Sequence, residues 1–85
     1  MDITFLPAAA WSFERDSVLV FAQADDRRIV CVVTQEYLTY PRSRPLTEEE
    51  ALELFDAQRT RIEARLRQRI LAGMFDANGD ILLRS

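Results

Sequence analysis

Residues 47–72 constrain the fold most, because this segment has the features of one long helix. Thr47 and Glu50 form a capping-box pattern, in which the threonine hydroxyl accepts from the backbone N–H of Glu50 and the carboxylate accepts from the backbone N–H of Thr47. Gly73 is the residue type that most often follows the last helical turn. Such a helix has about 26 residues and a length of roughly 39 Å, whereas a compact domain of 85 residues is only about 30 Å across. We therefore expect the helix to break, to extend beyond the domain or to pack against another molecule.

One side of this helix is an apolar stripe with a charged interruption. At about 100° per residue, the stripe predicted to face the core contains Ala51, Leu52, Phe55, Ile62, Leu66, Ile70 and Gly73. Arg59 lies inside this stripe, where an unpaired charge would destabilise the core. Asp56 and Glu63 are close enough along the helix to pair with it. We expect a structural ion pair; the alternative is that Arg59 binds a carboxylate of a ligand or a partner.

A row of arginines follows the side of the same helix. Arg61, Arg65 and Arg69 are four residues apart, and like charges at this spacing repel each other. They can be neutralised by acidic groups of the same chain, by a nucleic-acid backbone or phosphate ligand, or by the acidic first turns of a second copy: Glu48, Glu49 and Glu53. Because one half of the helix is acidic and the other basic, two antiparallel copies would match in charge. We expect a homodimer through this helix, with pairing through a sheet edge as the competing geometry.

Two strands in the first half of the chain give the clearest sheet signal. Residues 17–24 and 28–34 are apolar runs separated by the short polar turn Asp25-Asp26-Arg27, which predicts an antiparallel hairpin. Both strands carry apolar side chains on both faces. We therefore expect the helix to cover one face, and a partner or a hydrophobic flap containing Trp11 and Phe13 to cover the other.

The remaining segments complete the expected fold. A first strand, residues 3–6, is expected to stop at the following proline, and residues 80–84 form a last strand. Residues 35–40 are expected to form a helical turn and residues 41–45 a loop. The chain is thus predicted to be a single α+β domain over residues 1–85. It would consist of a small antiparallel β-sheet, with three N-terminal strands plus a C-terminal strand, packed against one long α-helix.

The composition removes the usual catalytic groups. The 11 basic residues are all arginines and there is no histidine, so lysine Schiff bases, lysine or histidine general bases and the commonest zinc ligand are excluded. The single cysteine, Cys31, cannot form an intrachain disulfide and lies in an apolar strand, where a thiol packs as a small hydrophobic group. Two glycines are too few for a glycine-rich phosphate loop. We expect no enzymatic activity, no cofactor and no bound metal.

The net charge of −3 argues against general binding to nucleic acids or to anionic membranes. The N-terminal residues lack the basic and apolar regions of a signal peptide, and there is no run of about 18 apolar residues that could span a membrane. We expect a cytoplasmic protein of a bacterium.

A second candidate site is a shallow polar groove lined by Tyr37, Tyr40, Arg42 and Arg44. These aromatic and guanidinium groups lie close together in the sequence. A small-ligand binder would use this groove or the pair formed by Arg59 and Glu63.

Four motifs follow one another along the chain. Residues 15–21 read RDSVLVF, residues 29–33 read IVCVV, residues 55–63 have the pattern F-x-x-x-R-x-x-I-E, and residues 80–83 read DILL, a short final strand. This order resembles a small bacterial family, domain of unknown function 1488, whose members are similar in length. The resemblance implies the α+β fold described above and places Arg59 and Glu63 in one motif. It implies no particular activity.

These features indicate a non-catalytic interaction or regulatory module that acts as a homodimer or with a protein partner. The alternative is a nucleic-acid accessory protein that uses the arginine row of the long helix.

Overall fold

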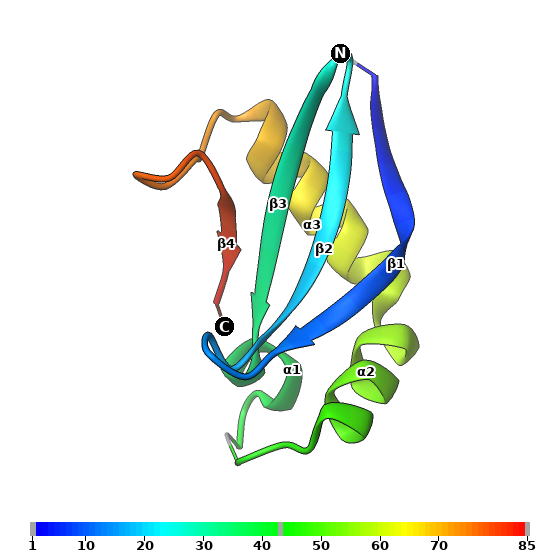
Figure 1. The fold of residues 1–85 in the computed structure, drawn as a ribbon, viewed down its shortest axis with the longest axis vertical. Coiled ribbons are helices and arrows are strands. Elements are labelled where there is room, and N and C mark those ends of the chain that lie inside the picture. Colours follow the sequence, from blue (N-terminus) through cyan, green and yellow to red (C-terminus); the bar gives the residue numbers. More distant parts are fainter. Residues whose placement is uncertain (1, 43, 85) are drawn as a thin grey trace.

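The computed structural model describes residues 2–42 and 44–84. In this part of the chain, four strands form one sheet and three helices lie on one side of it (Figure 1). In chain order the elements are β1 (Ile3–Ser12), β2 (Ser17–Ala24), β3 (Arg27–Thr34), α1 (Gln35–Thr39), α2 (Glu48–Ala57), α3 (Arg59–Leu71) and β4 (Ile81–Leu83).

The sheet has the strand order β1-β2-β3-β4 and is mixed. The predicted hairpin is confirmed, since β2 and β3 pair antiparallel with Ala24 opposite Arg27, and Asp25 takes the left-handed conformation of a tight turn with φ of 55°. The expectation of an entirely antiparallel sheet is wrong, because β4 pairs parallel to β3. The helices between these two strands run back along the sheet, so the chain enters β4 at the end where β3 began (Figure 1).

Strand β1 continues past Pro7, contrary to the prediction that it would stop there. The pairing with β2 shifts between Phe5 and Ala9, and a proline is tolerated at such an irregularity on an edge strand because no ladder hydrogen bond is lost. Trp11 is part of this strand, opposite Val18, and packs against the core on the helix side. The predicted flap therefore does not cover the other face of the sheet.

The predicted long helix is two helices, α2 and α3, that meet at Gln58. The capping box that starts α2 is confirmed: Thr47 Oγ1 accepts from the backbone N–H of Glu50 at 3.1 Å, and Glu50 Oε1 accepts from the backbone N–H of Thr47 at 3.2 Å. Gln58 has φ of −111° and ψ of 10°, and its Nε2 donates to the Leu38 carbonyl at 3.3 Å. The described chain measures 35 × 24 × 22 Å, so a straight helix of roughly 39 Å would leave the sheet. The break keeps both halves on it.

The end of α3 follows the prediction. Gly73 has φ of +70°, its N–H donates to the Ile70 carbonyl, and the N–H of Met74 donates to the Arg69 carbonyl. This is the Schellman pattern, which favours glycine because a side chain is strained at positive φ.

The core lies between the sheet and the helices. Its sheet side is formed by alternate residues of β2, β3 and β4, with Val20, Cys31 and Ile81 fully buried. Its helix side is formed by the predicted stripe, of which Ala51, Phe55, Ile62, Leu66 and Ile70 are buried. None of the described helices is long and apolar enough to cross a membrane.

Candidate functional site

Arg59 is held by the fold through its whole guanidinium group. Its Nε donates to Glu63 Oε2 at 2.8 Å, its Nη1 to the Pro7 carbonyl at 3.0 Å, and its Nη2 to the Leu6 carbonyl at 2.8 Å. The group also lies 5.2 Å from the centroid of the Phe55 ring. Glu63, rather than Asp56, is the ion-pair partner. Arg59 therefore ties the irregular part of β1 to the start of α3, and it has few donors left for a ligand.

The predicted arginine row lies along α3 beyond this contact. Arg61 and Arg65 are exposed and Arg69 is half-buried. Among residues 2–42 and 44–84, none of these three arginines forms an ion pair. Glu48 and Glu49 are exposed in the first turn of α2, on the other side of the break at Gln58.

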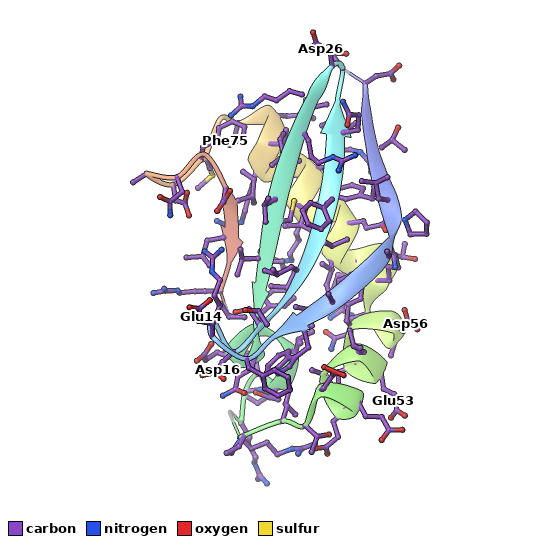
Figure 2. The ribbon with its side chains drawn as sticks, viewed as in Figure 1. Glu14, Asp16, Asp26, Glu53, Asp56 and Phe75 are labelled. Atoms are coloured by element: carbon purple, nitrogen blue, oxygen red, sulfur yellow. The ribbon has the colours of Figure 1, made fainter. Side chains whose placement is uncertain are left out.

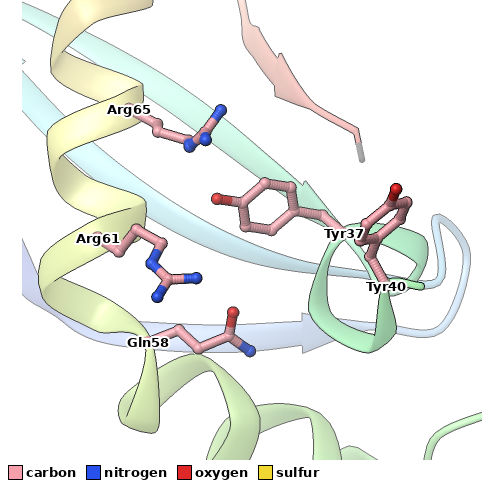
Figure 3. A pocket seen from close by; sticks show the side chains of 5 residues that line it. All are labelled: Tyr37, Tyr40, Gln58, Arg61 and Arg65. Atoms are coloured by element: carbon pink, nitrogen blue, oxygen red, sulfur yellow. The ribbon is translucent and has the colours of Figure 1, made fainter. Parts of the chain in front are cut away.

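Two of these arginines share a cleft with two tyrosines. Tyr37 and Tyr40 from α1 and its end, Gln58 from the helix break, and Arg61 and Arg65 from α3 line an open cavity of about 210 Å³. Figure 3 shows both guanidinium groups extending from α3 toward α1, and the hydroxyl end of Tyr37 pointing back toward α3. We call this the α1–α3 cleft.

The predicted groove of tyrosines and nearby arginines is thus divided. Arg42 and Arg44 line a neighbouring hollow with Leu38, Thr39, Pro41 and Leu54, instead of facing the two tyrosines. Arg44 is engaged there, because its Nη1 donates to Glu50 Oε2 at 3.1 Å. The backbone N–H of Thr47 and then Arg44 lower the pKa of Glu50.

The cleft supplies hydrogen-bond donors rather than acid–base or nucleophilic groups. Guanidinium groups only donate hydrogen bonds, and a tyrosine hydroxyl adds one further donor and can also accept. The one thiol lies in the core, where burial, followed by the charge of Asp80, raises the pKa of Cys31 to about 12. No group of three or more carboxylate or thiol side chains gathers in the described residues to hold a metal.

A second surface is the face of the sheet that carries no helix in the described chain (Figures 1 and 2). The strand registers place Ala10, Leu19, Val32 and Leu82 side by side across all four strands, with Phe21 beside Val30 in the next row. Polar pairs border these rows: Gln23 with Arg28 at one end, and Ser17 with Thr34 at the other. We call the six apolar residues the open sheet face.

Sequence reasoning identified the arginines and the tyrosines separately but missed Gln58. Its spacing and type carry no signal of their own. The only available sign was the gap between Phe55 and Ile62 in the apolar stripe, where Gln58 and Arg59 stand instead of core residues.

Comparison with known proteins places the chain in a family. The model of the family described as "Protein of unknown function (DUF1488)" matches residues 3–83. A crystal structure of a DUF1488-family protein of unknown function from Shewanella loihica PV-4 is similar, with a TM-score of 0.89 and 26% sequence identity, over 99% of this chain and 96% of that chain. Comparison with curated protein sequences gave no match. Because the family model covers nearly the whole chain, the protein belongs to the DUF1488 family, whose function is unknown.

Proposed function

We propose that the protein is a non-catalytic binding module of the bacterial cytoplasm that pairs with a second copy through the open sheet face. The observation that carries this proposal is the two-row apolar pattern on that face. Leu19, Phe21, Val30 and Leu82 remain half-exposed there, although a strand that faces water on one side normally alternates apolar with polar residues.

The ends of the face favour a second copy as the occupant. Arg28 lies at one end, with its guanidinium 6.0 Å from the Phe21 ring centroid. Glu14 and Asp16 lie in the β1–β2 turn at the opposite end (Figure 2). A two-fold axis parallel to the plane of the sheet and perpendicular to the strands would place the two open sheet faces against each other and bring Arg28 of each copy toward the acidic turn of the other. The same surface is therefore complementary to itself in apolar content, and each Arg28 can meet an acidic side chain of the other copy.

The size of the face predicts a weak dimer. Three strands of about eight to ten residues and the three-residue β4, about 4.8 Å apart, give a face of about 450 Å² per copy. Two such faces bury about 900 Å², which is slightly below the usual lower limit of a specific interface and is typical of a weak one. We expect a dissociation constant in the micromolar range.

Other dimer geometries have less support. The break at Gln58 removes the overhang that suggested a pairing through one long helix. Pairing through a sheet edge is disfavoured because β1 is interrupted by Pro7 and a shift of register, and β4 is only 3 residues long.

The non-catalytic part of the proposal rests on the chemistry of the side chains. Histidine and lysine are lacking in the sequence, and the single thiol has a pKa raised to about 12. A nucleophile at this pKa is almost entirely protonated at neutral pH.

Sedimentation velocity over a hundredfold range of protein concentration, at about 50 mM and about 500 mM salt, tests the proposal. We expect a monomer–dimer equilibrium that high salt weakens little, because the contact is mainly apolar. A dimer lost at high salt would instead indicate charge-matched helices. A monomer at every concentration would overturn the pairing.

Two phenylalanines provide a matched pair of variants. Phe21→Glu places a charge in the centre of the open sheet face, near Arg28, and should abolish the dimer without unfolding the monomer. Phe13→Glu makes the same change outside the apolar rows, at a residue that is 74% exposed in the β1–β2 turn, and should not weaken the dimer, because it only adds an acid beside Glu14 in the turn that meets Arg28 of the other copy. Equal effects of the two variants would contradict a dimer through this face.

A further inference from the structure

The α1–α3 cleft brings together two positive charges, on Arg61 and Arg65, that form no ion pair within residues 2–42 and 44–84. Arg61 and Arg65 are neighbours along one side of α3. No carboxylate side chain lies three or four residues before or after either of them, because these positions are Ala57, Gln58, Ile62, Ala64, Gln68, Arg69 and the two arginines themselves. Two guanidinium groups at this spacing repel each other. Arg59, only two residues away, has every branch of its guanidinium bonded to a carboxylate or carbonyl. Arg59 is therefore a structural arginine, whereas Arg61 and Arg65 are available to bind a ligand.

The remaining lining groups also face the cavity. The hydroxyl end of Tyr37 points toward α3 in the region of the two arginines (Figure 3). Gln58 donates its Nε2 to the Leu38 carbonyl, which fixes the amide and leaves its oxygen directed toward the cleft. Tyr40 is 71% exposed at the end of α1, so its ring offers a flat apolar surface at the edge of the cavity.

We propose that the α1–α3 cleft binds the phosphomonoester group of a small sugar phosphate or nucleotide. A phosphomonoester carries nearly two negative charges and three acceptor oxygens at neutral pH, so it can engage both guanidinium groups and the Tyr37 hydroxyl together. A carboxylate has one charge and two oxygens, and would satisfy only one of the arginines. The Gln58 oxygen accepts from a sugar hydroxyl, and a planar base stacks on Tyr40.

The volume of the cleft suits a small ligand. A cavity of about 210 Å³ holds about seven water-sized groups, enough for a phosphate and the adjoining sugar atoms but not for a longer chain. A nucleic-acid strand would instead need many phosphate contacts along one surface, and the net charge of −3 opposes a polyanion.

Isothermal titration at about 50 mM salt tests this proposal. The probes are inorganic phosphate, ribose 5-phosphate, adenosine 5′-monophosphate, adenosine, and a single-stranded oligonucleotide without a terminal phosphate. We expect phosphate-bearing small molecules to bind and adenosine not to bind. Tighter binding of the nucleotide than of ribose 5-phosphate identifies a nucleotide ligand, whereas equal binding identifies a sugar phosphate. Binding of the oligonucleotide alone, or of no probe at about 10 mM, overturns the proposal.

Single substitutions assign the binding to the cleft. Arg61→Gln and Arg65→Gln should each weaken phosphate-ester binding about tenfold or more, since each removes a charge-assisted hydrogen bond. Tyr37→Phe should weaken it by a smaller factor. Arg67→Gln is the matched control, because it removes an arginine from the same helix whose guanidinium lies over Phe5, away from the cleft. The assignment of binding to the α1–α3 cleft is contradicted if Arg61→Gln and Arg65→Gln bind as the parent does, or if Arg67→Gln weakens binding as much as they do.

Discussion

Arg59 stands on the core-facing side of the helices, at a position where an unpaired charge would destabilise the fold. Its guanidinium satisfies Glu63 and the carbonyls of Leu6 and Pro7, where the register shift in β1 leaves no regular ladder bond. The residue therefore acts as a clamp between the edge strand and α3. Its presence in the apolar stripe is explained by backbone groups more than fifty positions away along the chain.

Replacing this arginine tests the clamp. We expect Arg59→Met to lower the free energy of unfolding by about 1.5–3 kcal/mol, because three hydrogen bonds from a charged group are lost while the apolar stem is kept. The free energy of unfolding of Arg59→Lys should lie between those of the parent and of Arg59→Met, since one ammonium group cannot reach all three acceptors. Urea denaturation measures both. Arg67→Met is the control, and a loss no larger than in that variant would show that the clamp contributes little.

Cys31 is a second residue whose surroundings determine its chemistry. Burial, and next the negative charge of Asp80, raise the pKa of Cys31 from 9.0 to about 12. Because the folded pKa lies above the unfolded one, this thiol stabilises the fold fully below about pH 9, and the contribution is lost as the pH rises from 9 toward 12.

The measurable consequence is a protected thiol. We expect iodoacetamide at pH 8 to leave Cys31 unmodified in the native protein and to alkylate it rapidly in concentrated urea, as followed by mass spectrometry. Alkylation at the same rate with and without urea would contradict the buried environment.

At the scale of elements, the start of α2 depends on a capping box that also changes the pKa of Glu50. Thr47→Ala should cost about 1 kcal/mol in stability, because the N–H of Glu50 loses its acceptor. The hydrogen bond from the Thr47 N–H, followed by Arg44, lowers the pKa of Glu50. A lowered folded pKa gives stability that is present above the ordinary pKa of glutamate and is lost as the pH falls.

Glu50→Gln separates this charge effect from the hydrogen bond alone. We expect the variant to unfold at lower urea than the parent at pH 7, and the difference to shrink as the pH falls and Glu50 itself becomes protonated. Glu49→Gln, in the same turn but outside the capping box, controls for removal of a charge near the helix start. A difference that is constant with pH would exclude the linked titration.

The elements that sequence predicted well are those fixed by short-range rules. The β2–β3 hairpin, the Thr47 capping box and the turn after α3 at Gly73 each depend on a few adjacent residues. The break at Gln58 and the extension of β1 beyond Pro7 depend on contacts between distant segments, through Leu38 and Arg59. No local pattern contains those contacts, so the predicted single helix and the short first strand were wrong.

The same reasoning applies to the candidate site. The sequence places Tyr37 and Tyr40 with Arg42 and Arg44 in one group, and Arg61, Arg65 and Arg69 in another, because the members of each group are close along the chain. Their meeting in one cleft depends on how α1 packs near the α2–α3 break, which only the assembled fold determines.

For the whole molecule, the sheet divides two surfaces with different chemistry. The helix side holds the core and the α1–α3 cleft, and the other side holds the open sheet face (Figures 1 and 3). A pairing of two sheets would therefore leave both clefts accessible. On this arrangement, Phe21 belongs to the pairing surface and Arg61 to the ligand surface, so each can be altered without removing the other.

Pairing through the open sheet face should also make thermal stability depend on concentration. A folded dimer at a hundred times its dissociation constant gains about 1.5 kcal/mol per chain over the monomer, and for a domain of this size that corresponds to a rise in Tm of roughly 6 °C or more. Calorimetry at several protein concentrations measures the shift. Phe21→Glu should have a Tm that does not vary with concentration, whereas Phe13→Glu should behave as the parent. An intrinsic loss of stability lowers Tm equally at all concentrations, so only the dependence of Tm on protein concentration reports the pairing. A Tm of the parent protein that does not change with concentration would show that the open sheet face remains in contact with water.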